Sequence, residues 1–329
     1  MAIIAPTLRF NMSGASADPE IESGRYRAAL EMAEFAEQHR FGLVNVEEHH
    51  GTEIGWMGNP LTMAGLILGR TQRIKVRAMA VLVTLYDPIR LAEEIALLDL
   101  AGRGRLTVVM GIGYRPVEYH MMDKDWDGRA DAIEHVIDTL LKAWSGEPFQ
   151  YRGKPVQVRP RPYTRPHPPI TYGGMSRPAA RRAAKLGLAF QPAQPMPELA
   201  EYYLAECARL GTKGEVINYK DMSLVFVDDD PDRAWRELGP YFLKEVEEYS
   251  SWARQGVERH YSVKTESVED LRGRKVFEIL TPDECLARAS TSVGPYEPIL
   301  HPLAGGIPVD RAWRSLEIFR DKVLAKHPA

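Results

Sequence analysis

Four consecutive titratable residues, Glu47 to His50, are the part of this chain best suited to chemistry. They follow an apolar stretch, residues 41–46, with the composition of a buried strand. A carboxylate beside an imidazole can hold the ring in one tautomer and prepare it for general acid–base work. Because neighbouring side chains of an extended segment point to opposite faces, His49 and His50 are predicted to face different surroundings, with Glu48 holding one ring. Two alternatives are a hydrogen-bonded structural pair and an Fe(II) site built from two histidines and a carboxylate.

A second candidate site lies at residues 172–178, where an apolar run ends in Gly173-Gly174-Met175-Ser176. Two glycines allow a close backbone approach, and Ser176 is placed to cap a following helix. Unpaired amides at a helix N-terminus bind anions, so this segment is interpreted as a phosphate site. The alternative is an ordinary capped helix after a tight turn.

A third segment, residues 111–114, ends another predicted strand. Small residues there, including Gly113 before Tyr114, leave room for a flat ring, although a plain strand-to-loop connection has the same composition. Glu118, on the loop that follows, is interpreted as a solvated carboxylate, with a role in the site as the alternative. His301, after the last predicted strand, is a further candidate for a residue that faces the pocket.

Alternating strands and helices must position these residues. The expected strands are residues 7–12, 41–46, 75–84, 105–110, 169–172, 188–191, 223–227 and 298–301. Helical periodicity between them predicts an α/β fold, a (β/α)₈ TIM barrel in one domain over residues 1–329, with its site at the C-terminal ends of the strands. The polar segment 254–298, before the last strand, is interpreted as an insertion or lid.

Composition limits the function classes. The chain has 329 residues and a formal net charge of −3, which argues against nucleic acid or an anionic membrane as partner. It shows no signal peptide and no apolar run long enough to span a bilayer. Two cysteines, Cys207 and Cys285, do not suggest a disulfide framework, so a cytoplasmic location is expected.

An ordered set of short motifs resembles the bacterial luciferase-like flavin monooxygenase superfamily. The motifs include Glu48-His49-His50, Gly58-Asn59-Pro60, Asp87-Pro88-Ile89-Arg90, Gly102-Arg103-Gly104-Arg105, Tyr172-Gly173-Gly174-Met175-Ser176 and Ser315-Leu316-Glu317-Ile318-Phe319. Each motif alone is weak, but together they cover nearly the whole chain. The similarity is weakest between residues 211 and 298.

The resemblance implies a luciferase-like barrel that binds reduced FMN, or the deazaflavin F420, at its C-terminal mouth. The phosphate would lie at Gly173, Gly174, Met175 and Ser176, and the flavin ring would contact Met79, Ala80, Gly113 and Tyr114. The family's non-prolyl cis peptide would fall at Met79-Ala80. His49 would be the catalytic acid–base residue, oriented by Glu48, and O₂ would add to the flavin C4a carbon to give a peroxide.

The implied reaction is the oxidation of a small organic substrate by O₂, with a separate flavin reductase and a homodimeric enzyme. Luciferase α-subunits carry Cys and Arg where this chain has Gly113 and Tyr114, which counts against a light-emitting aldehyde reaction. Two alternatives stay open. One is an F420-dependent oxidoreductase that transfers hydride without O₂, and the other is a flavin-binding stabilising subunit without activity.

Overall fold

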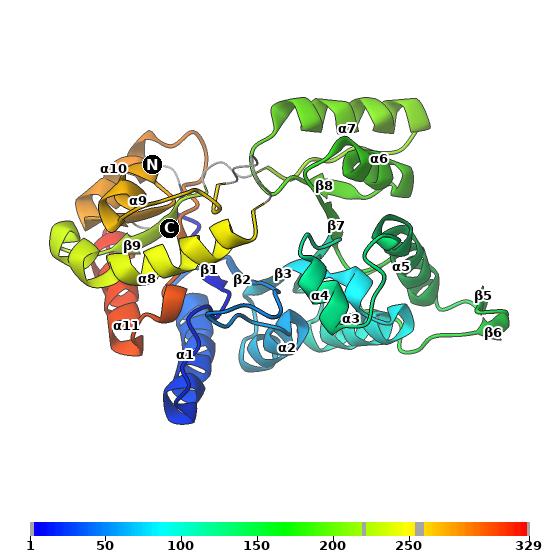
Figure 1. Ribbon diagram of the computed structural model, residues 1–329, viewed down its shortest axis with the longest axis horizontal. Coiled ribbons are helices and arrows are strands. Elements are labelled where there is room, and N and C mark those ends of the chain that lie inside the picture. Colours follow the sequence, from blue (N-terminus) through cyan, green and yellow to red (C-terminus); the bar gives the residue numbers. More distant parts are fainter. Residues whose placement is uncertain (1–2, 219–221, 254–259, 328–329) are drawn as a thin grey trace. The chain divides into compact units, whose positions relative to one another are not determined.

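The computed structural model describes residues 3–218, 222–253 and 260–327. Its internal contacts divide the chain into two compact units (Figure 1). The first unit comprises Met1–Asn45, Thr52–Met57 and Lys220–Ala329, and the second comprises Val46–Gly51 and Gly58–Tyr219. Strand β2 (Leu43–Val46) lies where the chain first passes from one unit to the other. A single domain over the whole chain stays a prediction.

The first unit contains four parallel strands in the order β10-β9-β11-β1. Its strands are β1 (Thr7–Phe10), β9 (Leu224–Val227), β10 (Phe277–Leu280) and β11 (Ile299–Leu300). Its helices are α1 (Pro19–Gln38), α8 (Pro231–Ser251), α9 (Val268–Arg274), α10 (Pro282–Thr291), η2 (Ala304–Gly306), α11 (Val309–Ile318) and η3 (Phe319–Leu324). Helix α8 packs its aromatic side chains on this sheet, since the Phe242 ring stacks on Phe277 with ring centroids 4.3 Å apart.

The second unit contains a parallel sheet in the order β3-β4-β7-β8. Its strands are β3 (Lys75–Leu82), β4 (Leu106–Gly111), β7 (Ile170–Gly173) and β8 (Ala189–Gln191), with a separate antiparallel pair, β5 (Phe149–Tyr151) and β6 (Lys154–Val156). Its helices are α2 (Pro60–Arg70), η1 (Val83–Leu85), α3 (Pro88–Gly102), α4 (Pro116–Met121), α5 (Arg129–Ser145), α6 (Arg177–Leu186) and α7 (Pro197–Leu210). Parallel strands connected through helices agree with the predicted alternation of strand and helix.

One capping pattern starts many of these helices. Asp18, Asn59 and Asp87 each accept hydrogen bonds from the first turn, and each is followed by proline at the first helical position. Proline fits there because its missing N–H would have no partner inside the helix. The same Asp-Pro signal starts α1 at Pro19, within a polar stretch that apolar periodicity alone does not mark as helix.

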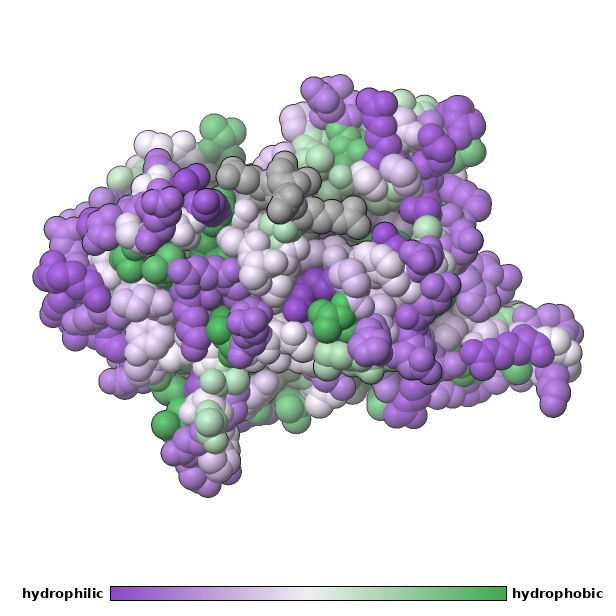
Figure 2. Space-filling view, viewed as in Figure 1, coloured by the Kyte–Doolittle hydropathy of each residue, from purple (hydrophilic) through white to green (hydrophobic). Residues whose placement is uncertain are grey.

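Two segments contain more regular structure than predicted. The turn-rich stretch after α5 includes the β5–β6 hairpin, whose exposed surface is mainly hydrophilic (Figure 2). Within the predicted lid, 254–298, strand β10 joins the sheet of the first unit, and α10 starts at a capping box formed by Thr281 and Glu284. Residues 254–259 of that segment lie outside the described residues. Mobility of the segment stays a prediction.

Both cysteines are buried and neither is in a disulfide. Burial raises the pKa of the Cys285 thiol to about 12, so it stays protonated at neutral pH. Within the described ranges, none of the helices combines the length and the apolarity needed to cross a membrane.

Candidate functional site

Strand register brings several predicted site residues to one edge of the second unit. Leu82 pairs with Gly111, and Gly173 pairs with Gln191, at the C-terminal ends of β3, β4, β7 and β8. The Gln191 Nε2 atom lies 3.4 Å from the Met79 sulfur, which links the last strand of this edge to the first. Met79, Ala80, Gly113 and Gly173 therefore belong to one sheet edge, as the sequence predicted.

The surface of this edge is built from small residues. The peptide bond between Met79 and Ala80 is cis, as the resemblance implied. A Cβ atom built on Gly111 would lie 2.9 Å from the Ala80 Cβ, so β4 can pass β3 here only as glycine. Gly113 has a φ of 74°, which glycine adopts at no steric cost.

The glycine turn before α6 has the predicted geometry. Ser176 caps the helix, since its Oγ accepts the Ala179 N–H at 3.4 Å. A Cβ atom on Gly174 would lie 2.5 Å from the Ala179 Cβ, and one on Gly173 would lie 3.0 Å from a Val109 methyl. Packing within the chain therefore requires glycine at position 174 and leaves little room for a side chain at position 173. Met175 is half-buried and Ser176 is exposed, so this helix start is open to a ligand. Phosphate binding stays a prediction.

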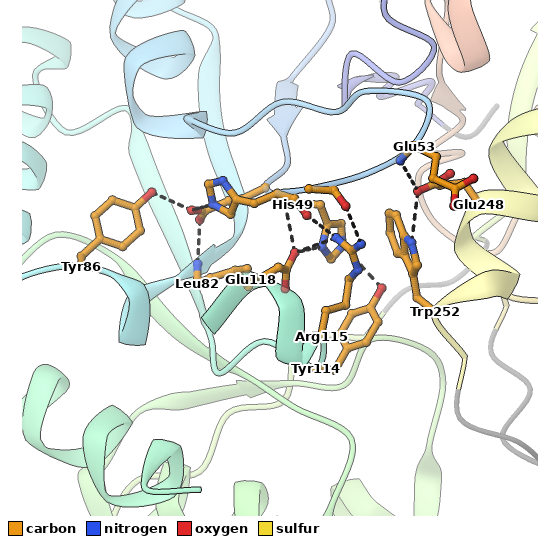
Figure 3. A network of polar contacts seen from close by, with 12 residues as sticks. His49, Glu53, Leu82, Tyr86, Tyr114, Arg115, Glu118, Glu248 and Trp252 are labelled. Atoms are coloured by element: carbon orange, nitrogen blue, oxygen red, sulfur yellow. Dashed lines mark hydrogen bonds and ion pairs between the residues drawn. The ribbon is translucent and has the colours of Figure 1, made fainter. Parts of the chain in front are cut away.

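The His49 ring is held by a buried carboxylate from another element. Its Nδ1 atom lies 2.8 Å from Glu118 Oε1, and the Glu118 side chain is fully buried in α4 (Figure 3). Its Nε2 atom lies 3.4 Å from the Tyr114 hydroxyl, and the two rings meet edge to face. Because an ionised carboxylate can only accept, Nδ1 carries a proton and Nε2 is the atom available for proton exchange.

The predicted orientation of His49 by Glu48 is wrong. Glu48 Oε1 instead lies 3.0 Å from Nε2 of His50 and accepts the Tyr86 hydroxyl at 2.8 Å. Its other oxygen accepts the Leu82 N–H at 2.7 Å. Glu48 therefore ties the residues after β2 to the end of β3. Burial and the Glu48 charge raise the pKa of Tyr86, so its hydroxyl stays a donor.

The interpretation of Glu118 as a solvated carboxylate is also corrected. Burial alone would raise its pKa, but its hydrogen bond to His49, the His49 charge, the His50 N–H and the Arg115 charge together hold the pKa below its ordinary value. Arg115 Nη1 lies 3.3 Å from Glu118 Oε1 and also donates to the His50 carbonyl, while Nη2 donates to the Gly51 carbonyl at 3.1 Å. One guanidinium thus holds both the carboxylate and the segment that carries His49.

His301 lies in the first unit and is fully buried. Its Nδ1 atom lies 2.9 Å from the Arg9 carbonyl, and its Nε2 atom lies 3.1 Å from a Glu245 oxygen. Although burial opposes ionisation, the charges of His301 and Arg9 hold the pKa of Glu245 well below its ordinary value. These contacts make His301 part of an interior ionic cluster, and we assign it no site role.

A second polar group in Figure 3 also belongs to the first unit. The Glu53 N–H donates to Glu248 Oε1 at 3.0 Å, and the Trp252 indole donates to the same oxygen at 3.2 Å. The Trp56 ring packs on Tyr249 and Trp252, with centroid separations of 4.9 and 5.2 Å. The C-terminal turns of α8 therefore hold residues 52–57 of their own unit.

Sequence reasoning did not name Arg115, and it favoured a solvated role for Glu118. A signal was present, because Pro116 at a first helical position predicts a short helix, and the third residue of that helix is Glu118. No local pattern could show that its partner would be His49, 69 positions earlier. Over the described parts of the chain, no group of three or more His, Cys, Asp or Glu side chains is arranged to bind a metal ion.

Comparison with known proteins assigns this chain to a family. A family model described as luciferase-like monooxygenase matches residues 1–304. The β chain of alkanal monooxygenase from Photorhabdus laumondii is 26% identical over 284 residues, which cover 80% of this chain and 81% of that protein.

Solved structures support the same assignment of fold. The monooxygenase RslO1 from Streptomyces bottropensis superposes with a TM-score of 0.76 at 19% identity, covering 99% of this chain and 100% of the other. The oxygenating constituent of 3,6-diketocamphane monooxygenase from Pseudomonas putida, solved in complex with FMN, gives 0.68 at 18% identity and covers 99% of each chain. The predicted luciferase-like (β/α)₈ fold is confirmed. The chain belongs to the luciferase-like monooxygenase family.

Proposed function

We propose that this chain is the oxygenating component of a flavin-dependent monooxygenase that uses reduced FMN and O₂ to oxidise a small organic substrate. Family membership supports a flavin monooxygenase, and the structural neighbour solved with FMN supports this form of the cofactor. The observation that carries the proposal is the arrangement of the second unit. There, the His49 imidazole contacts the buried Glu118 carboxylate, and glycines lie at the C-terminal ends of the strands.

The residues present fit a flavin. Gly173, Gly174, Met175 and Ser176 would hold its phosphate, because an exposed capping serine and a backbone without Cβ atoms suit an anion at a helix N-terminus. Met79, Ala80, Gly113 and Tyr114 would contact the ring. Each of these four residues is half-buried, which leaves part of its surface for a ligand.

The residues of this chain supply binding and proton transfer. When bound, reduced flavin supplies the electrons for the activation of O₂. The Nδ1–H group of His49 donates a hydrogen bond to Glu118. The Nε2 atom is therefore the one that takes up or releases a proton during the reaction. The Tyr114 hydroxyl, 3.4 Å from Nε2, is the second group at this atom that can exchange a proton.

An oxygen-uptake assay with substrate screening tests the proposal. FMN, NADH and an FMN reductase would be combined with the protein, and straight-chain alkanals and cyclic ketones would be offered, following the names of the relatives. We expect product formation that depends on protein and O₂. The variant His49→Ala should keep its affinity for reduced FMN and form product about a hundredfold more slowly, because a general acid–base group is lost.

His120→Ala is the matched control, since His120 lies exposed on α4. It should keep the rate of the unchanged protein. An unchanged rate in His49→Ala would remove His49 from the reaction. Binding of F420 without binding of reduced FMN, with substrate turnover in the absence of O₂, would replace the proposal by the alternative of hydride transfer to or from the deazaflavin.

We also infer a separate flavin reductase, a cytoplasmic location and a homodimer. The reductase is expected because the P. putida neighbour is the oxygenating constituent of its monooxygenase. A cytoplasmic location agrees with two cysteines that form no disulfide. A homodimer is supported by exposed leucines on α2 and α3, where Leu66 is 50% exposed and Leu97 is 60% exposed.

A further inference from the structure

The buried carboxylate of Glu118 receives three donors on a single oxygen. His49 Nδ1 lies 2.8 Å from Oε1, the His50 N–H 3.1 Å and Arg115 Nη1 3.3 Å. The donors come from the residues after β2 and from the start of α4. Glu118 therefore joins two segments that are far apart in the sequence and fixes the ring of one of them.

We propose that Glu118 is the positioning residue of His49, and that Arg115 holds this pair in place by binding the carboxylate and the backbone after His49 together. This inference rests on the proposed role of His49 in proton transfer. It adds an assignment that the sequence did not give, because the sequence paired His49 with Glu48.

The contact with Glu118 selects one tautomer of the His49 ring. A neutral imidazole can carry its proton on either nitrogen, and the hydrogen bond at one nitrogen decides which. With a carboxylate at Nδ1, the neutral ring is held as the Nδ1–H form and presents an Nε2 lone pair. Without Glu118, both forms would be populated and part of the protein would present the wrong nitrogen for proton uptake.

Glu118 also places a negative charge beside the His49 ring. The carboxylate faces His49 and Arg115, and its neighbour on α4 is the buried phenol of Tyr119. His50 contributes its N–H, while its ring is paired with Glu48. Since the pKa of Glu118 is lowered, the carboxylate is ionised at neutral pH and stabilises a positive charge on His49 when the ring takes up a proton. The ionised carboxylate also adds stability to the fold, which is present above the unfolded-state pKa of Glu118 and is lost as the pH falls through its lowered folded-state pKa.

Arg115 holds the carboxylate and the backbone after His49 in a fixed arrangement. Arg115 donates to the carbonyls of His50 and Gly51, the two residues after His49, and it contacts the carboxylate that holds the ring. A guanidinium reaches three acceptors in one plane, whereas an ammonium cannot match that geometry. In addition, Glu118 Oε2 is buried and has no hydrogen-bond partner among the described residues. Such atoms are uncommon, and a role in the reaction is one physical reason for a protein to retain them.

Nitrogen NMR of the histidines tests the inference on the protein without flavin. With ¹⁵N-labelled histidine at alkaline pH, the two tautomers give different chemical shifts, and His49→Ala identifies the signal of His49. We expect the Nδ1–H form in the unchanged protein and a mixture in Glu118→Met, which lacks an acceptor. Glu118→Gln should restore the Nδ1–H form, because an amide oxygen still accepts, although it carries no charge.

Activity provides the second measurement. In Glu118→Gln we expect oxygen uptake with reduced FMN to show kcat lowered about 10- to 100-fold, with an unchanged Kd for reduced FMN. Arg115→Lys should lower kcat in the same way. Glu134→Gln, a change of a carboxylate on α5 that pairs with Arg182 and Lys185, is the control and should have no effect.

Two results would overturn the inference. One is an unchanged His49 tautomer in Glu118→Met, and the other is a wild-type kcat in Glu118→Gln. If Glu118→Met does not fold, the kcat of Glu118→Gln still decides. If no oxygenase activity is found, the tautomer result stands by itself, so a failure of the proposed function is distinguishable from a failure of this inference.

Discussion

Among single residues, adjacent side chains of one segment point in different directions and so contact different polar groups. His49 and His50 are adjacent, yet the first lies on Glu118 and the second on Glu48. Their divergence follows from the geometry of an extended segment and could be predicted. The identity of each carboxylate could not, because Glu118 comes from a helix that packs there only in the folded chain. The sequence therefore predicted that the two rings face different surroundings, but it did not predict which carboxylate each ring contacts.

The phosphate site gives a prediction at this scale. Ser176→Asp keeps an oxygen that can cap α6 but adds negative charge where the FMN phosphate is expected. We expect the Kd for FMN to rise about tenfold or more, corresponding to about 1.4 kcal/mol, while riboflavin, which has no phosphate, binds as before. Fluorescence titration measures both.

Ser267→Asp is the matched control, because Ser267 also caps a helix through its side chain, in the other unit. It should change neither the affinity for FMN nor the affinity for riboflavin. An equal loss of FMN and riboflavin affinity in Ser176→Asp would mean that the change disturbs the fold of the turn, and that phosphate lies elsewhere.

At the scale of elements, capping residues set where helices begin. Asp18 Oδ1 accepts the N–H groups of Glu20 and Ile21, at 2.8 and 3.4 Å, in the same way as Asp87 does at the start of α3. Apolar periodicity marks the middle of α1 but not its start, since the first turn has no buried apolar face. The capping signal fixes helix ends better than periodicity does in this chain.

The cap of α1 can be tested by stability. We expect Asp18→Ala to lower the free energy of unfolding by about 1 kcal/mol, because two N–H groups lose their acceptor. Asp18→Asn retains an acceptor and should recover most of that loss. Urea denaturation measures both variants, and equal stability of the alanine and asparagine forms would show that the cap contributes nothing.

At the scale of the whole molecule, the order of strands and helices was predictable while their number was not. Each of the eight expected strands is present with shifted ends, because apolar runs of this length mark strands reliably. The residues 277–280 were read as part of a polar insertion and form β10, which pairs with β9. Their apolar run is short and lies among charged residues, so composition hid a strand that tertiary pairing stabilises.

The exposed leucines of α2 and α3 predict that the chain forms a dimer. Leu66 on α2 and Leu97 on α3 flank a close contact between these helices at Gly65 and Leu98. Apolar side chains exposed on two packed helices suit a symmetric interface. We expect the protein to be a dimer by light scattering, and the double variant Leu66→Glu with Leu97→Glu to have half that mass.

Leu204→Glu is the control, since Leu204 is 45% exposed on α7, outside this face. It should leave the mass unchanged. If the double variant is still a dimer, the interface lies elsewhere. If the protein without substitutions is a monomer, the proposed homodimer is wrong.

The burial of both cysteines protects their thiols from oxidation in the proposed oxygenase. An oxidant that escapes the reaction attacks thiolates first, but Cys207 and Cys285 are out of reach and the latter stays protonated. The exposed sulfur atoms at the end of α4 belong to methionines instead. Met121 is 53% exposed, and Met122, which follows the helix, is 36% exposed. Damage would therefore appear as methionine sulfoxide, a lesion that cellular reductases repair, on the very helix that carries Glu118.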